Sequence, residues 1–114
     1  MDRDELLKKI DSLNNELFKI RRHIHAHPEL SGLENQTAIL ISGYLKKIGW
    51  RVTESIGRTG VVADLGPKDK GFIGLRVDMD ALPIIENTNL SFSSKVDGVM
   101  HACGHDIHLS LIHI

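Results

Sequence analysis

This 114-residue sequence has few cysteines and aromatic residues and little net charge. It contains one cysteine, one tryptophan and one tyrosine, and its net charge is only −1. A single cysteine cannot form a disulfide within the chain, which is typical of a reducing compartment, so we expect a cytoplasmic protein. The near-zero net charge gives no electrostatic reason to expect nucleic acid or an anionic membrane as a partner. The apolar runs are too short to cross a bilayer, and the charged N-terminus lacks the order of a signal peptide.

The common zinc-binding patterns are missing as well. There is no paired Cys-x-x-Cys and no His-Glu-x-x-His, which excludes the zinc-finger spacing and the helical metalloprotease motif. With 41% hydrophobic and 25% charged residues, the composition is that of an ordinary globular protein. No repeat, low-complexity tract or linker divides the chain, so we expect residues 1–114 to make one small domain at most.

The first half of the sequence has the periodicity of helices. Apolar residues recur at three- and four-residue steps from Leu6 to Ile24 and predict one helix. This helix should stop near His27, because Pro28 disfavours helical geometry in the residue before it. A second helix is expected from about Gly32 to Ile48. The residues expected on its buried face are Ala38, Ile41, Leu45 and Ile48.

The periodicity then changes to that of strands. Short strands are expected at residues 50–55, 60–65 and 72–78. The residues between the last two have the composition of a turn, so we expect those two strands to pair as a hairpin. Two helices followed by strands place the chain in the α/β or α+β class.

Asp78 and Asp80 stand at the end of the third expected strand. Side chains two residues apart on a strand point to the same side, so the two carboxylates should emerge together. A bound cation would relieve their repulsion, and sites often lie at strand ends in α/β folds. The alternative is a solvated loop, in which Asp80 caps a turn and Arg76 pairs with one of the carboxylates. These residues alone favour neither interpretation.

The segment 101–108, His-Ala-Cys-Gly-His-Asp-Ile-His, gathers three imidazoles, the single thiol and a carboxylate. Imidazole and thiolate are donors that zinc and related metals prefer. In a helix the three histidines would share a face and the cysteine would point away. Gly104 favours a loop instead, which would let Cys103 and His105 meet one ion. Further ligands, or groups that orient the ligands, could be His101, Asp106 and His108.

Together these motifs resemble the amidohydrolase branch of the aminoacylase/carboxypeptidase metallopeptidase family, which includes hippurate hydrolases, N-acetyl-diaminopimelate deacetylases and auxin-conjugate hydrolases. Three ordered segments carry the resemblance: 21–31 (Arg-Arg-His-Ile-His-Ala-His-Pro-Glu-Leu-Ser), 78–83 (Asp-Met-Asp-Ala-Leu-Pro) and 100–108. Glu34 and Thr37 extend the first of them. The likeness covers nearly the whole chain, and the combination of motifs makes it specific.

The resemblance implies a metal-dependent amidohydrolase that acts on a small-molecule substrate, an N-acyl amino acid or a related conjugate. Its fold would be a zinc-peptidase-like α/β catalytic domain with an inserted lid domain, and dimers of the family form through that lid. Two divalent metals (zinc, manganese, nickel or cobalt) would lie in the cleft. Cys103 and His105 match metal ligands, Asp80 matches a carboxylate that orients the site, and Asp78 lies close by.

The sequence departs from the family pattern after His108. No Glu-Glu pair follows Cys103, the lid and the C-terminal histidine ligand are missing, and His113 cannot be assumed to replace that ligand. We therefore interpret the chain as the truncated N-terminal portion of the catalytic domain. We expect the chain alone to have negligible activity, because removal of a general base by itself typically costs about 10²–10⁴ in rate.

Two other interpretations remain open. The chain could be a small non-catalytic metal-binding module that uses Cys103 and His105, with His101 or His108 as a further ligand. It would then bind Zn²⁺ stoichiometrically and fold with it. It could also be a helical interaction protein with incidental histidines. That protein would form an oligomer through its first helix, and chelators would not affect it.

Overall fold

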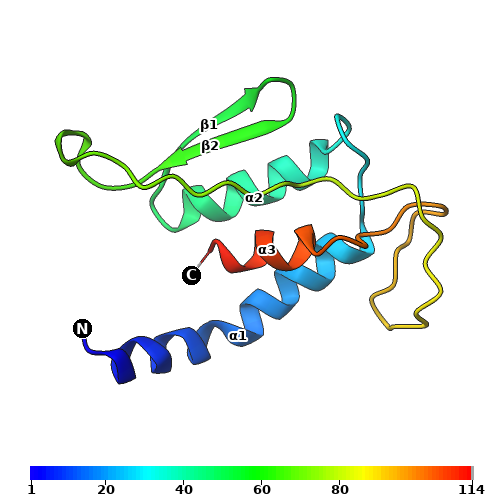
Figure 1. Cartoon of the computed structure of the whole chain (residues 1–114), viewed down its shortest axis with the longest axis horizontal. Helices are drawn as coiled ribbons and strands as arrows, with labels where there is room; N and C mark the ends of the chain where they lie inside the picture. Colours follow the sequence, from blue (N-terminus) through cyan, green and yellow to red (C-terminus); the bar gives the residue numbers. More distant parts are fainter. Residues whose placement is uncertain (114) are drawn as a thin grey trace.

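The two expected helices and the first two expected strands are present in the expected order, while the helix at His105–Leu111 was not predicted. The computed structural model describes residues 1–113. Figure 1 shows α1 (Arg3–Ala26), α2 (Asn35–Lys47), the strands β1 (Arg51–Ile56) and β2 (Gly60–Asp64), and α3 (His105–Leu111). A single 3₁₀ turn at Lys68–Lys70 follows the second strand. Among the described residues, no helix has the length and apolarity needed to cross a membrane.

α1 begins and ends at residues with clear local signals. The Asp2 side chain caps its N-terminus by accepting a 2.8 Å hydrogen bond from the backbone N–H of Glu5. At the other end His27 is the C-cap, directly before Pro28. The predicted stop near His27 is therefore confirmed, since the residue before a proline disfavours helical geometry.

The hydrophobic core lies where the second half of α1 meets α2 and α3. Figure 1 shows α3 lying along α1, with α2 on its other side. The first turns of α1 extend past α2 and α3, so Leu6 and Leu7 of the predicted stripe are 42% and 47% exposed. Ile48 was expected in the core but is 48% exposed. Ile48 is the C-cap residue of α2, and the helix ends there because the next residue, Gly49, has a left-handed φ of +90°. The buried cluster comprises Ile20, Ile24, Ile41, Leu45 and Leu109.

A carboxylate from the preceding loop caps α2. Glu29 accepts hydrogen bonds from the backbone N–H of Gln36 (3.0 Å) and from the N–H and hydroxyl of Thr37 (both 2.7 Å). These contacts satisfy N–H groups that have no partner within the helix, and the negative charge complements the helix dipole. The helix starts at Asn35 rather than at Gly32, because Gly32 has a left-handed φ of +80°.

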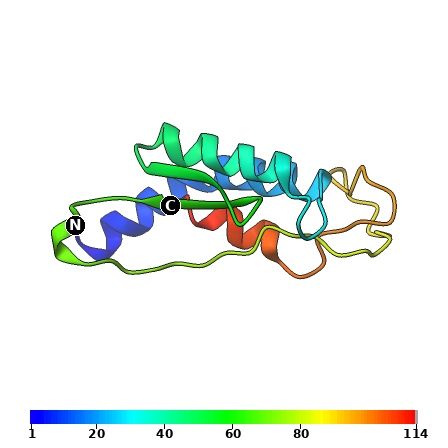
Figure 2. The same cartoon turned by 90° about the horizontal axis from the view of Figure 1, so that it is seen from above.

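The hairpin joins β1 to β2, so the prediction that the second expected strand would pair with the third is wrong. β1 and β2 are antiparallel, with Arg51 opposite Asp64. A short turn separates them, so their pairing closes a small loop at little entropic cost. Within residues 1–113, the segment 72–78 joins no strand ladder and runs past the hairpin (Figure 2). Its Ile73 and Leu75 are 95% and 80% exposed.

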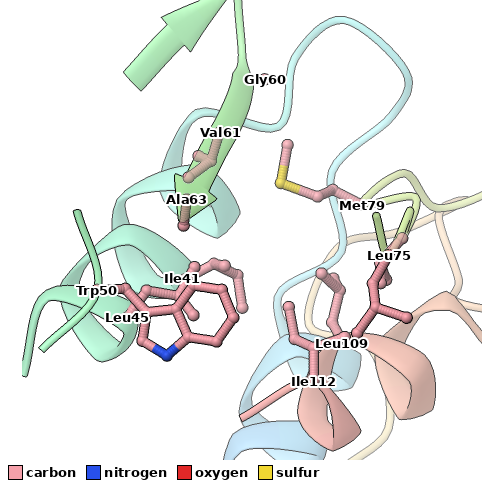
Figure 3. Close-up of a pocket in the computed structure, with 11 residues that line it drawn as sticks. Ile41, Leu45, Trp50, Gly60, Val61, Ala63, Leu75, Met79, Leu109 and Ile112 are labelled. Carbon is pink, nitrogen blue, oxygen red and sulfur yellow. The ribbon is translucent and has the colours of Figure 1, made fainter. Parts of the chain in front are cut away.

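An apolar pocket separates β2 from the segment that was expected to pair with it (Figure 3). Its volume is about 210 Å³, and side chains from α2, the hairpin, residues 75–79 and α3 surround it. Apolar side chains of both segments line this pocket, so among the described residues no backbone ladder joins them. No His, Cys, Asp or Glu lines this pocket, so it offers no ligands for a metal.

Candidate functional site

Short backbone bridges hold the chain at Asp80 between two other segments. The N–H of Ala81 donates to the carbonyl of Glu29 at 2.8 Å, just beyond the end of α1. On the other side, Leu82 and Met100 exchange two hydrogen bonds of 2.9 Å. These bridges bring the end of the 72–78 segment next to residues 101–108, the two places where the sequence predicted site residues.

The structure brings His105 and Asp80 together. Nδ1 of His105 lies 2.8 Å from the backbone carbonyl oxygen of Asp80 and 3.1 Å from one of its carboxylate oxygens. A carbonyl oxygen can only accept, so Nδ1 carries a proton, and in the neutral tautomer that this bond selects, the lone pair is on Nε2. A metal-binding histidine normally has its other ring nitrogen bonded in this way. Both side chains are partly exposed, at 23% for His105 and 28% for Asp80.

Cys103 lies in the turn before α3, and its thiol is exposed. Gly104 caps α3 with a left-handed φ of +84°, so the loop that this glycine favours is present and the helix begins only at His105. An accessible thiol two residues from an imidazole with a free Nε2 fits a transition metal. The donor set is incomplete, because the described part of the chain holds no cluster of three or more His, Cys, Asp or Glu side chains around one point.

The other candidates lie in different surroundings. Asp78 pairs with Arg76 at 3.1 Å, and the two side chains are 49% and 88% exposed, as in the solvated-loop alternative. His108 is exposed on α3. His101 is buried, and neither of its ring nitrogens has a hydrogen-bond partner among residues 1–113. Burial lowers the pKa of His101, which favours its neutral form.

Asp106 was predicted as a candidate site residue, but the buried network to which it belongs was not predicted. Its Oδ2 accepts from Nε of Arg21 (2.9 Å) and from Nδ1 of His25 (2.8 Å), and its side chain is 1% exposed. Nε2 of His25 lies 3.0 Å from Glu86. The available signal was the four-residue spacing of Arg21 and His25, which places both on one face of α1.

Glu86 is held by several donors besides His25. Its carboxylate accepts from the Thr88 hydroxyl and from the backbone N–H of Ser94. Burial raises the pKa of Glu86, but the hydrogen bonds from Thr88, His25 and Ser94 outweigh this effect and lower it from 4.5 to about 2.

The stability of the chain is therefore expected to depend on the ionisation of Glu86. The folded-state pKa is depressed, so the carboxylate contributes stability that is present above pH 4.5 and is lost as the pH falls toward about 2. Urea unfolding should show a steeper loss of stability below pH 4.5 for the wild type than for Glu86→Gln. Glu16→Gln, at an exposed carboxylate 3.9 Å from Lys47, is the control and should follow the wild type. Parallel curves for the wild type and Glu86→Gln would contradict the prediction.

Comparisons with known proteins match this chain to hydrolases. Residues 74–113 match the sequence profile of peptidase family M20/M25/M40. A probable hydrolase of Synechocystis sp. is 53% identical over 109 residues, and a hippurate hydrolase of Campylobacter jejuni is 53% identical over 105 residues. These alignments cover 94% and 90% of this chain but only 28% and 27% of the two relatives.

A solved structure has the same fold. The Bacillus subtilis YXEP protein, described as a dinuclear metal binding peptidase from the M20 family, superposes with a TM-score of 0.83 at 43% identity. The match covers 90% of this chain and 30% of that one. The chain thus spans less than a third of the relatives that it matches, which agrees with its interpretation as an N-terminal portion of such a protein.

Proposed function

Because this chain belongs to peptidase family M20/M25/M40, we propose that residues 1–114 are part of the catalytic domain of a metal-dependent amidohydrolase. The substrate is the amide bond of an N-acyl amino acid or a related conjugate, a class that includes the hippurate named in one relative. The observation that carries the proposal is the hydrogen bond from His105 to the carbonyl of Asp80. It selects the tautomer that leaves Nε2 free, two residues from the exposed thiol of Cys103.

In this proposal Cys103 and His105 are ligands of a divalent metal, and Asp80 orients the imidazole. The metal, when bound, supplies Lewis acidity toward the amide carbonyl and makes water a stronger nucleophile at neutral pH. Thiolate and imidazole suit zinc, nickel and cobalt, manganese is a candidate through the family resemblance, and the dinuclear relative supports two metals in the complete site. The two ligands present here account for only part of such a site.

His101 is the strongest further candidate among the polar residues of the loop. Its two ring nitrogens are buried and have no partner among residues 1–113, and the carboxylates of Asp106 and Asp80 are close enough to act on it. Buried polar groups normally have a partner, so a group outside the described chain, or a water, is expected there. Asp106 supports the site by joining the start of α3 to Arg21 and His25 of α1. The exposed Asp78 and His108 are weaker candidates.

Equilibrium dialysis of the purified chain against Zn²⁺ tests the metal site. The wild type is expected to bind Zn²⁺, and Cys103→Ala and His105→Ala should each weaken binding by more than about 10-fold, because each removes a direct ligand. His23→Ala, at an exposed histidine of α1, is the matched control and should bind as the wild type does. Equal affinity in all variants would place the metal elsewhere, and no binding by the wild type would contradict the proposal.

Circular dichroism with and without EDTA separates this proposal from a metal-dependent folding module. The hydrophobic cluster joins α1, α2 and α3 without any metal ligand among its members. We therefore expect the helical signal to persist when the metal is removed. Loss of that signal in EDTA would favour the non-catalytic metal-binding module.

A further inference from the structure

A buried polar cluster connects the candidate metal loop to α1. At its centre, His25 lies between two carboxylates, with Nδ1 2.8 Å from Asp106 and Nε2 3.0 Å from Glu86. We propose that His25 is a positioning residue that holds the turn carrying Cys103 and His105 in place, acting through Asp106. The inference rests on the proposed function and adds to it a residue that does not bind the metal.

The link from His25 to the metal loop is short. Asp106 follows His105 directly in the first turn of α3. Its side chain is 1% exposed. Among the described residues, its carboxylate accepts hydrogen bonds from Arg21 and His25, which both belong to α1. Because the two residues are neighbours at the start of one helix, a shift of Asp106 moves the backbone that carries the His105 ring.

The end of α1 also fixes the other partner of His105. The carbonyl of Glu29, two residues after the C-cap of α1, accepts the N–H of Ala81 at 2.8 Å. This bond holds the residue next to Asp80, whose own carbonyl accepts from His105. One end of α1 therefore sets the position of both groups in the hydrogen bond that defines the imidazole tautomer.

A histidine suits the bridging position because an imidazole can donate from two opposite nitrogens at once. His25 is 3% exposed at its side chain and faces a carboxylate on each side, so both nitrogens donate when the ring is protonated. Nε of Arg21 donates a further hydrogen bond to Asp106 at 2.9 Å. The amide of a glutamine carries its donors on a single nitrogen and cannot span the two carboxylates in the same way.

On the side of the cluster away from α3, hydrogen bonds also hold Glu86 in place. Glu86 accepts the backbone N–H of Ser94 at 2.6 Å, and the N–H of Lys95 donates to the carbonyl of Ala26 at 2.9 Å. The ring of Phe92 meets the His25 ring edge-on, with centroids 5.6 Å apart. On one side, His25 is therefore held by Glu86 and the 86–95 segment. On the other side, it holds Asp106 and with it the turn that carries Cys103 and His105.

NMR of the full chain without metal provides the first test, since ¹H–¹⁵N correlations of histidine rings report their tautomers. In the wild type, His105 is expected in the Nδ1–H form that its bond to Asp80 requires. His25→Gln is expected to convert it to a mixture of tautomers. Leu45→Ala, which weakens the core without touching the cluster, is the control and should keep the wild-type form.

Titration with Co²⁺, followed by the thiolate-to-cobalt absorption of Cys103, provides the second test. His25→Gln is expected to weaken Co²⁺ binding by about 10- to 100-fold, the usual effect of losing a group that orients a ligand. Leu45→Ala should bind as the wild type does at a temperature where both are folded. If His25→Gln does not fold, Glu86→Gln removes one of the two carboxylate partners and is expected to change both measurements in the same direction.

The outcomes separate this inference from the proposed function. A folded His25→Gln with the wild-type tautomer and the wild-type Co²⁺ affinity would overturn the positioning role alone. If the wild type binds no Co²⁺, the proposed function fails, and the tautomer of His105 still decides whether His25 positions that ring.

Discussion

Asp106→Ala is expected to lower the free energy of unfolding by about 3–5 kcal/mol, because it leaves the buried His25 and the partly buried Arg21 without their carboxylate. Arg21 and His25 both donate to this side chain, which is 1% exposed. Without it, the N–H groups of Arg21 and His25 lose their acceptor, and His25 lies where water reaches poorly. The total stability of a small domain is about 5–15 kcal/mol, so this one substitution should bring the chain close to unfolding.

Urea unfolding followed by circular dichroism measures the effect. Asp11→Ala is the matched control, since it removes an exposed carboxylate from the same helix that Arg21 and His25 belong to. Its effect is expected to stay within about 0.5 kcal/mol. A change below about 1 kcal/mol for Asp106→Ala would show that the carboxylate is solvated in solution and that the network does not hold the metal loop.

The purified chain is expected to hydrolyse N-acetyl and N-benzoyl amino acids no faster than buffer, even with added Mn²⁺ or Zn²⁺. Residues 1–113 contain no cluster of three metal ligands. Neither Glu29 nor Glu86 is free to act as a general base, because Glu29 caps α2 and Glu86 holds His25. Loss of a general base alone typically costs about 10²–10⁴ in rate, and an incomplete metal site costs more.

The assay needs a complete relative beside the chain. The hippurate hydrolase of Campylobacter jejuni, of which this chain matches 27%, is the positive control under identical metal concentrations. Cys103→Ala distinguishes turnover by this chain from turnover by a contaminant. Metal-dependent hydrolysis that disappears in Cys103→Ala would show that these residues are sufficient for catalysis and would overturn the expectation.

The first two helices, α1 and α2, could be predicted because their signals are local. Asp2 caps the start of α1, and Pro28 stops it one residue after the C-cap. Gly104 likewise marks the turn before α3. In each case the deciding interaction joins residues within a few positions, so the sequence pattern contains it.

The hairpin was mispredicted because strand pairing depends on which edges meet. The segment 72–78 has the apolar content of a strand, but an apolar pocket lies between it and β2. β1 contains the polar residues Arg51, Thr53 and Glu54, yet it pairs with β2 across a short turn. Composition indicates that a segment can be a strand, and proximity in the fold determines its partner.

By itself the sequence determined the bounds of α1 and the existence of α2, and that a thiol and an imidazole lie two residues apart around Gly104. Only the tertiary structure decided that the Asp80 carbonyl orients His105 and that His25 joins Asp106 to Glu86. These partners are 25, 81 and 61 residues apart along the chain. Caps and turns act through neighbouring residues, whereas these contacts exist because packing of α1 against α3 and the 80–100 segment brings distant residues together.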